Sequence, residues 1–209
     1  MSDITSMNEA VLLIGPSGVG KTPLGDLLER DGLGGRACVH MDFGAELRRL
    51  VAEGVASDRV TAEELEFLRE VLEAGALLEA DRMSLGLRIV KGFLARRQAD
   101  RSTLVVLNGF PRHPAQAVAV EEVVGVVGVV RLACDEQTIL RRIETDPGGD
   151  RQGREDDEPE KVVARFRLFL QRTAPLVEHY RSRGVRVETV DVSEGAGPEE
   201  LGQALAELW

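Results

Sequence analysis

The sequence predicts an α/β fold in which a parallel sheet of five strands lies between two layers of helices. Short apolar runs of strand length alternate along the chain with longer segments of helical periodicity, which is the pattern of a parallel sheet with helical crossovers. The run 103–107 is almost continuously apolar, as expected for a strand buried on both faces of such a sheet. A glycine-rich loop joins the first predicted strand to the first predicted helix.

A helical segment follows each predicted strand. The predicted strands are 10–14, 37–40, 103–107, 126–132 and 185–190. The first helix begins at about residue 21 and carries Pro23 in its first turn, where a missing N–H is tolerated. The later predicted helices are 115–120, 135–143, a long helix from Pro159 that bends or restarts at Pro175, and 198–208.

Residues 43–97 look wholly helical and form a block longer than one crossover requires. A first helix is predicted over 45–53, and Thr61 and Glu64 have the spacing of a capping box that opens a second helix. Asp81 is expected to cap a third helix, whose apolar residues recur at helical intervals. We therefore expect one domain over 1–209, in which 43–97 is an inserted helical subdomain.

The glycine-rich loop is a phosphate-binding motif. Its sequence is Gly15-Pro16-Ser17-Gly18-Val19-Gly20-Lys21-Thr22, which matches G-x-x-x-x-G-K-T between a strand and a helix. The glycines allow the backbone N–H groups to surround an oligophosphate, and the helix N-terminus adds its positive dipole end. Lys21 can reach the β- and γ-phosphates, and the Thr22 hydroxyl can ligate Mg²⁺. The sequence therefore predicts binding of ATP and Mg²⁺ on a P-loop NTPase fold.

Composition narrows the class of protein further. The 209 residues are 43% hydrophobic and 30% charged, which is ordinary for a globular protein able to bury a core. The net charge of −10 argues against a nucleic-acid backbone as the main partner. No apolar segment approaches the roughly 20 residues of a membrane span, and the first residues lack the basic region of a signal peptide. Cys38 and Cys134 match no metal or redox spacing, so we expect a cytoplasmic protein with reduced thiols.

Further motifs follow the strands. Gly15, Asp42 and Asn108 fall at the C-terminal ends of predicted strands, where the ligands of parallel sheets bind. The longer motifs are Gly44-Ala45-Glu46-Leu47-Arg48, Asn108-Gly109-Phe110-Pro111-Arg112 followed by Gln116, Gly153-Arg154-Glu155-Asp156-Asp157 followed by Arg165, and Thr173-Ala174-Pro175-Leu176 followed by Tyr180. With the phosphate loop, and in this order, they resemble the nucleoside monophosphate kinases, most closely the adenylate kinases with a short lid.

The resemblance implies transfer of a phosphoryl group from ATP to a nucleoside monophosphate, AMP in the first place. Residues 43–97 would be the monophosphate-binding insert, and 144–155 would be the short lid. The implied donor site is Gly15, Ser17, Gly18, Val19, Gly20, Lys21, Thr22 and Arg142, with Arg141 as a rival for the role of Arg142. The implied acceptor site is Arg48, Leu78, Gly109, Arg112, Gln116, Arg154 and Arg165. The implied catalytic set is Lys21, Arg112, Arg142, Arg154 and Arg165, and the protein would be a monomer.

Two departures from the family pattern leave alternatives open. Phe43 stands where the family has a threonine in the acceptor pocket, so UMP, CMP or dAMP could replace AMP. Asn108 stands where the family has an aspartate, which removes a carboxylate from the magnesium shell. We therefore expect Mg²⁺ binding to depend more on the ATP phosphates and on Thr22, with Asp42 at the neighbouring strand end as a further contributor. A nucleotide-binding sensor without turnover is the rival from another class. The full set of arginines favours the enzyme, because binding alone does not require both lid arginines.

Overall fold

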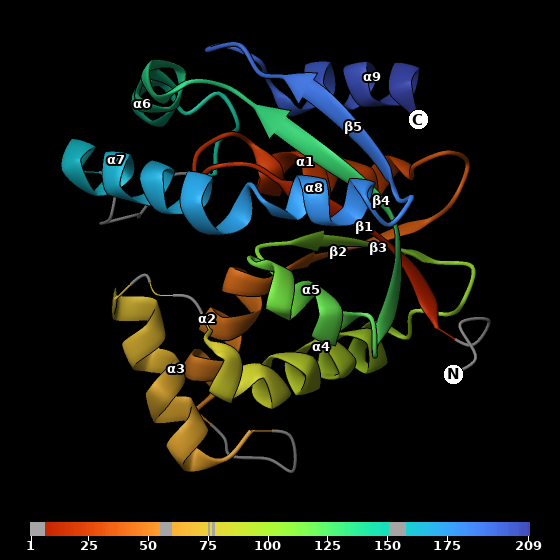
Figure 1. The fold of residues 1–209 in the computed structure, drawn as a ribbon, viewed down its shortest axis with the longest axis vertical. Helices are drawn as coiled ribbons and strands as arrows, with labels where there is room; N and C mark the ends of the chain where they lie inside the picture. Colours follow the sequence, from red (N-terminus) through yellow and green to blue (C-terminus); the bar gives the residue numbers. More distant parts are fainter. Residues whose placement is uncertain (1–6, 55–59, 75, 77, 151–157) are drawn as a thin grey trace.

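The computed structural model describes residues 7–54, 60–74, 76, 78–150 and 158–209 (Figure 1). Five parallel strands form one sheet in the order β2-β3-β1-β4-β5, which confirms the predicted fold class. The strands are β1 (Asn8–Ile14), β2 (Cys38–Asp42), β3 (Leu104–Asn108), β4 (Val124–Ala133) and β5 (Arg186–Asp191). Each starts or ends within a few residues of its predicted range.

Helices cover both faces of the sheet, as three layers require. They are α1 (Lys21–Asp31), α2 (Phe43–Glu53), α3 (Ala62–Ala74), the short 3₁₀ helix η2 (Ala80–Arg82), α4 (Met83–Arg97), α5 (Pro114–Val120), α6 (Glu136–Thr145), α7 (Pro159–Leu168), the π-helical turn η3 (Phe169–Thr173), α8 (Leu176–Arg181) and α9 (Pro198–Leu208). None of the helices in these described ranges is long and apolar enough to cross a membrane.

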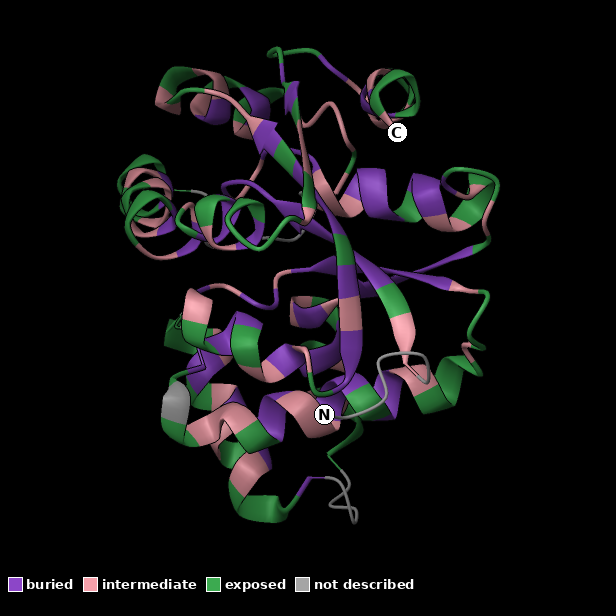
Figure 2. Ribbon diagram, turned by 45° about the vertical axis from the view of Figure 1, so that its right-hand side comes forward, coloured by how far each residue is buried: buried purple, intermediate pink, exposed green. Residues whose placement is uncertain are grey.

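The sheet is buried on both sides, which explains its apolar strands. Val11 and Leu13 pack into one core cluster with residues of α1 and α9, while Leu12 packs into a second cluster with residues of α4, α5 and α8. Successive residues of β1 thus enter opposite layers, as the two-residue repeat of a strand dictates. Figure 2 shows this buried sheet between helices whose outer faces are exposed.

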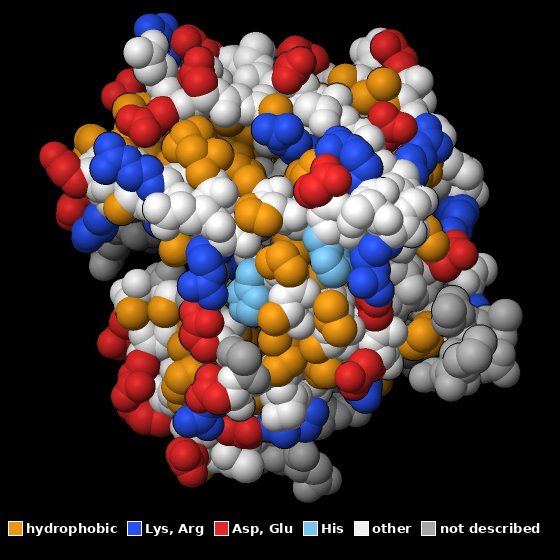
Figure 3. All heavy atoms as spheres, in the orientation of Figure 1, with side chains coloured by type: hydrophobic (Ala, Val, Ile, Leu, Met, Phe, Trp, Pro, Cys, Tyr) orange, Lys and Arg blue, Asp and Glu red, His pale blue; other side chains and the backbone are white. Residues whose placement is uncertain are grey.

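The described part of the block 43–97 is helical, as predicted, and contains α2, α3, η2 and α4. The capping box that opens α3 is confirmed, since the Thr61 N–H donates to Glu64 Oε2 at 2.9 Å and the Glu64 N–H donates to Thr61 Oγ1 at 3.2 Å. The expected cap at Asp81 is wrong, because Asp81 lies inside η2 and the residue that precedes α4 is Arg82, without a side-chain cap. Acidic side chains crowd the outer face over α3 (Figure 3), while the buried apolar residues of both α3 and α4 belong to one core cluster with the sheet.

A buried carboxylate joins α2 to α4. Glu46 is only 6% exposed and accepts hydrogen bonds from Arg96 at 2.7 and 2.8 Å and from Arg49 at 2.8 and 3.1 Å. Burial alone would raise the pKa of Glu46, but the hydrogen bonds from Arg96 and Arg49 outweigh it and lower the pKa below its usual value. The charged form of Glu46 therefore stabilises the packing of these two helices.

Replacing this carboxylate should destabilise the protein in a pH-dependent way. We expect Glu46→Gln to lower the free energy of unfolding by about 1–3 kcal/mol at neutral pH, since hydrogen bonds between charged groups are lost. Because the folded pKa lies below the unfolded value of about 4.3, the contribution is full above that pH and is lost as the pH falls through the folded pKa. Urea unfolding at about pH 7 and about pH 3.5 measures the difference.

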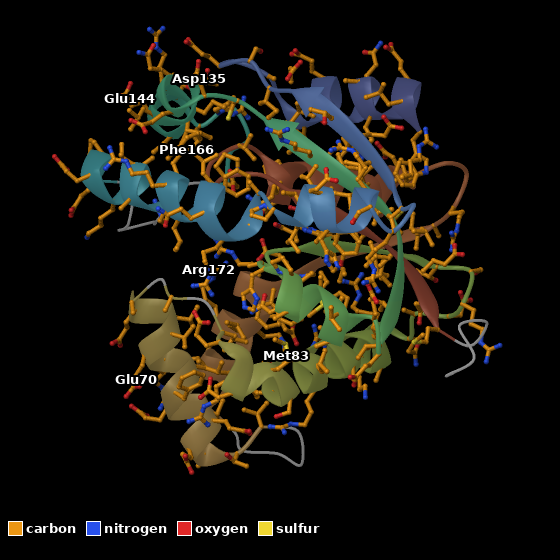
Figure 4. All side chains as sticks on the ribbon, in the orientation of Figure 1. Glu70, Met83, Asp135, Glu144, Phe166 and Arg172 are labelled. Carbon is orange, nitrogen blue, oxygen red and sulfur yellow. The ribbon has the colours of Figure 1, made fainter. Side chains whose placement is uncertain are left out.

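The matched control is Glu70→Gln on the exposed face of α3, where the side chain points away from the protein (Figure 4). It should change the free energy of unfolding by less than about 0.5 kcal/mol at either pH. A loss in Glu46→Gln that is equally large at both pH values would contradict the assigned role of the charge.

Candidate active site

The phosphate loop joins β1 to α1 and has the conformation that its glycines predict. Gly18 and Gly20 have φ angles of 90° and 102°, in the region that favours glycine. A Cβ on Gly15 would lie 2.7 Å from the Val19 side chain, which packs beneath the loop and is fully buried. Gly20 precedes α1 without a side-chain cap. The first N–H groups of α1 therefore remain available to an anion.

The loop forms one wall of a cleft of about 270 Å³ at the C-terminal ends of β1, β2 and β3. The insert supplies a second wall through α2 and α3, and α7 supplies a third, so the cleft is surrounded by segments far apart in the sequence (Figure 1). The predicted site residues that line it are Gly15, Ser17, Gly18, Gly20, Lys21, Thr22, Arg48, Leu78, Gly109, Arg112, Gln116 and Arg165. Donor and acceptor residues thus face one space.

Lys21 folds back over the phosphate loop. Its Nζ donates to the carbonyl oxygens of Gly15 at 2.8 Å and Pro16 at 2.7 Å. Both acceptors belong to the loop that would surround the phosphates. The ammonium group is therefore held against the backbone of the phosphate loop.

Thr22, Asp42 and Asn108 meet at the bottom of the cleft. Thr22 Oγ1 donates to Asp42 Oδ2 at 2.6 Å, and Asn108 Nδ2 lies 3.0 Å from Thr22 Oγ1 and 3.1 Å from Asp42 Oδ2. The other oxygen of Asp42 caps α2 by accepting from the Ala45 N–H at 2.9 Å. Burial would raise the pKa of Asp42, but the hydrogen bonds from Thr22 and Ala45, with the nearby His40 and Arg48, lower it.

Two arginines of the predicted acceptor site line the cleft. Arg112 follows β3 and is half-buried, and its guanidinium makes no hydrogen bond or ion pair with the described part of the chain. Burial lowers the pKa of this guanidinium, because no anion offsets the loss of water. Arg48 lies on α2 on the same side and is exposed. An uncompensated, desolvated cation in a cleft favours a bound anion.

The predicted acceptor pocket contains the hydrogen-bonded amide of Gln116 and an aromatic surface formed by Phe43 and Phe110. Gln116 is 1% exposed; its Oε1 accepts from the Arg112 N–H and its Nε2 donates to the Leu78 carbonyl, both at 2.6 Å. The structure therefore brings Gln116 and Leu78 together, as predicted, although each end of the amide already has a protein partner. Phe43 stacks on Phe110 with ring centroids 4.6 Å apart and forms the wall beside them.

Arg142 has a different setting from the one expected. It is 2% exposed, and its Nη1 donates to the carbonyl oxygens of Ser193, Glu194 and Ala196 at 2.7, 3.2 and 2.9 Å. Its Nε donates to the Gly18 carbonyl at 3.4 Å. Arg142 therefore ties the phosphate loop to the loop 193–196. Its rival Arg141 is exposed and pairs with Glu194 at 3.1 Å.

Three further observations complete the site. Arg165 lines the cleft from α7, as predicted, whereas Arg154 lies outside the described residues together with the end of the predicted lid. The sequence did not identify the loop 193–196 as part of the site. Arg142 lies more than fifty positions earlier in the sequence and contacts backbone carbonyls of this loop, which any residue type could supply, so no sequence pattern could have predicted the contact.

Comparisons with known proteins place the chain among kinases. A family model described as AAA domain matches residues 11–162. The chain is 33% identical to the adenylate kinase of Parvibaculum lavamentivorans over 87% of this chain and 83% of that one. It is 32% identical to the adenylate kinases of Stenotrophomonas maltophilia (88% and 91% of the two chains) and Thermus thermophilus (86% and 87%).

A solved structure supports the fold alone. The gluconokinase of Sinorhizobium meliloti superimposes with a TM-score of 0.54 and 19% identity over 97% of this chain and 94% of that one. The strand order, the phosphate loop and the kinase relatives agree on a three-layer P-loop fold. With its sequence similarity to adenylate kinases over most of its length, the chain belongs to the nucleoside monophosphate kinase family.

Proposed function

We propose that the protein transfers the γ-phosphoryl group of ATP to a nucleoside monophosphate, with AMP as the first candidate and two ADP as products. The observation that carries this proposal is that two anion-binding elements face one cleft. One is the phosphate loop with Lys21, and the other is Arg112, which has no ion pair within the described residues, with Arg48 beside it. A protein that only bound or hydrolysed ATP would need the first element and not the second.

The arrangement suits phosphoryl transfer because this reaction depends on positioning and charge neutralisation. Lys21 would leave the carbonyls of Gly15 and Pro16 and pair with the β- and γ-phosphates. Arg112 and Arg48 would hold the phosphate of the acceptor, which is already ionised and needs no general base. Arg165, with Arg154, would neutralise the transferred group. Arg142 would act as a positioning residue for the phosphate loop.

The residues at the bottom of the cleft fit Mg²⁺. This ion keeps several waters and binds through one or two protein oxygens together with the substrate phosphates. Thr22 Oγ1 and the ionised Asp42 offer such oxygens beside the phosphate loop. In the described ranges, no cluster of three or more His, Cys, Asp or Glu side chains could hold a metal alone. When bound, Mg²⁺ would neutralise charge on the β- and γ-phosphates.

The pocket places few constraints on the nucleobase of the acceptor monophosphate. Gln116 already bonds Arg112 and Leu78, and Phe43 replaces a polar residue, so the pocket offers an apolar surface and few open polar groups. UMP, CMP and dAMP are the alternative acceptors. A sensor without turnover is the alternative from another class. We further propose a cytoplasmic monomer.

A coupled assay of ADP release with ATP and a panel of monophosphates tests the proposal. Turnover with AMP should exceed turnover with UMP, CMP and dAMP at equal concentration. A higher rate with one of the others would reassign the acceptor and leave the reaction class intact. Gluconate is included because the solved neighbour is a gluconokinase. Turnover with gluconate and none with any monophosphate would overturn the proposal, and binding of ATP without any turnover would favour the sensor.

Binding of both substrates should also close the cleft. Water must be excluded from the transferring phosphoryl group, and the exposed ion pair of Arg172 on η3 with Glu79 already spans the gap toward the insert at 3.0 Å (Figure 4). We expect a bisubstrate analogue, two adenosines joined by five phosphates, to slow amide exchange in α2, α3 and α7. Protection that is confined to residues 15–22 would contradict closure. ATP alone, as the control, should protect the phosphate loop more than the insert.

A further inference from the structure

We infer that Asp42 supplies the carboxylate of the magnesium shell in this protein, and that Asn108 is a positioning residue that holds Asp42 and Thr22 in place. The inference rests on the proposed Mg²⁺-dependent phosphoryl transfer and assigns roles that the resemblance does not. In this chain, the end of β2 carries the acid Asp42 and the end of β3 carries the amide Asn108.

The first argument is the distance between Asp42 and Thr22. Adjacent ligands of an octahedral Mg²⁺ lie about 3 Å apart, because Mg–O distances are about 2.1 Å. Asp42 Oδ2 lies 2.6 Å from Thr22 Oγ1, so a cation on the threonine oxygen would have this carboxylate oxygen in its first or second shell. The contact also orients the hydroxyl, since its single hydrogen points to Asp42 and a lone pair is left for the metal.

The second argument is the orientation of the Asn108 amide. Its Nδ2 has three neighbours, namely Thr22 Oγ1 at 3.0 Å, Asp42 Oδ2 at 3.1 Å and His40 Nε2 at 3.5 Å. A carboxylate oxygen in place of this nitrogen would lie about as close to Asp42 Oδ2 and repel it. The amide instead donates to Asp42. The two positions are therefore coupled, because the acid at one is stabilised by a neutral donor at the other.

The third argument is that the neighbouring groups hold the Asp42 carboxylate in place. Asn108 is buried, and the Ala45 N–H fixes Asp42 at the start of α2. The positive charge of Arg48 lies near the Asp42 carboxylate. Asp42 is thus held at both oxygens, by Thr22 and Asn108 on one and by Ala45 on the other. A carboxylate fixed in this way beside a phosphate loop offers Mg²⁺ an oxygen ligand of the kind that it prefers.

The test is the effect of Mg²⁺ on ATP affinity, measured by calorimetry as the ratio of Kd with EDTA to Kd with excess Mg²⁺. Asp42→Asn keeps the shape of the side chain and its capping ability. We expect it to reduce this ratio at least tenfold while leaving the affinity for metal-free ATP within about threefold. Asp42→Ser, a second capping variant, should behave in the same way. The exchange variant, Asp42→Asn with Asn108→Asp, should restore the ratio to within about threefold of wild type.

The matched control is Asp135→Asn, which makes the same change at the residue that caps α6 (Figure 4) and that has no hydrogen bond to Thr22, Asp42 or Asn108 in the described chain. It should leave the ratio unchanged. A full magnesium effect in Asp42→Asn would overturn the role of Asp42, and a loss that the exchange fails to restore would overturn the pairing with Asn108. These results differ from a failure of the proposed function, in which the wild-type protein itself would bind no ATP or transfer no phosphoryl group.

Discussion

Arg112→Ala should lower turnover by several hundred-fold or more and leave the affinity for ATP within a few-fold of wild type. Misplacement of a reactant by about 1 Å can lower the rate about 10²-fold, and an arginine that neutralises charge in phosphoryl transfer contributes about 10³–10⁵. Arg112 is the half-buried cation on the acceptor side that has no anionic partner in the described chain, so its loss removes the anchor of the acceptor phosphate. The measurement is steady-state kinetics with the acceptor varied, together with the Kd for ATP.

The control for Arg112 is Arg101→Ala, an exposed arginine before β3, at the opposite end of the strand from the cleft. It should retain nearly full activity. Arg112→Lys should recover only part of the rate, because an ammonium cannot grip two phosphate oxygens as the planar guanidinium does. More than about a tenth of wild-type turnover in Arg112→Ala would mean that its role is misassigned.

Lys21→Ala should cause a loss of similar size for a different reason. The ammonium group that now bonds the Gly15 and Pro16 carbonyls would be the charge on the β- and γ-phosphates of ATP. We expect a fall of at least a few hundred-fold in kcat/KM for ATP and a weaker affinity for ATP, with the binding of the monophosphate little changed. The measurement is the same kinetic assay with ATP varied.

Lys91→Ala, on the exposed face of α4, is the control for Lys21. If Lys21→Ala instead weakened the acceptor and spared ATP, the assignment of donor and acceptor sides would be reversed. Together, the Arg112 and Lys21 variants therefore separate the two halves of the proposed site.

The sheet and the phosphate loop could be predicted because their signals are local. A buried strand such as β3 must be apolar along its whole length, and the glycines of the phosphate loop are required by φ angles that few other residues adopt. The convergence of Asp42 and Asn108 followed from a topological rule, since the ends of neighbouring parallel strands meet at one edge of the sheet.

The remaining features depend on contacts that no local pattern encodes. Arg142 was expected to face the nucleotide, but the tertiary fold directs it to the carbonyls of the loop 193–196. Asp81 had the residue type of a cap, yet a 3₁₀ turn precedes α4 and moves the helix start by one residue. Asn108 resembled a lost acid in the sequence, and only its contacts with Asp42 and Thr22 indicate a positioning role.

Transfer of a labelled phosphoryl group tests the central claim most directly. The protein is incubated with ATP labelled at the γ-phosphate, unlabelled AMP and Mg²⁺, and the products are separated by chromatography. Our account predicts that the label appears in the β-phosphate of ADP, at a rate that falls several hundred-fold in Arg112→Ala. Label that appears only as inorganic phosphate, or that stays in ATP with every monophosphate tried, would contradict it.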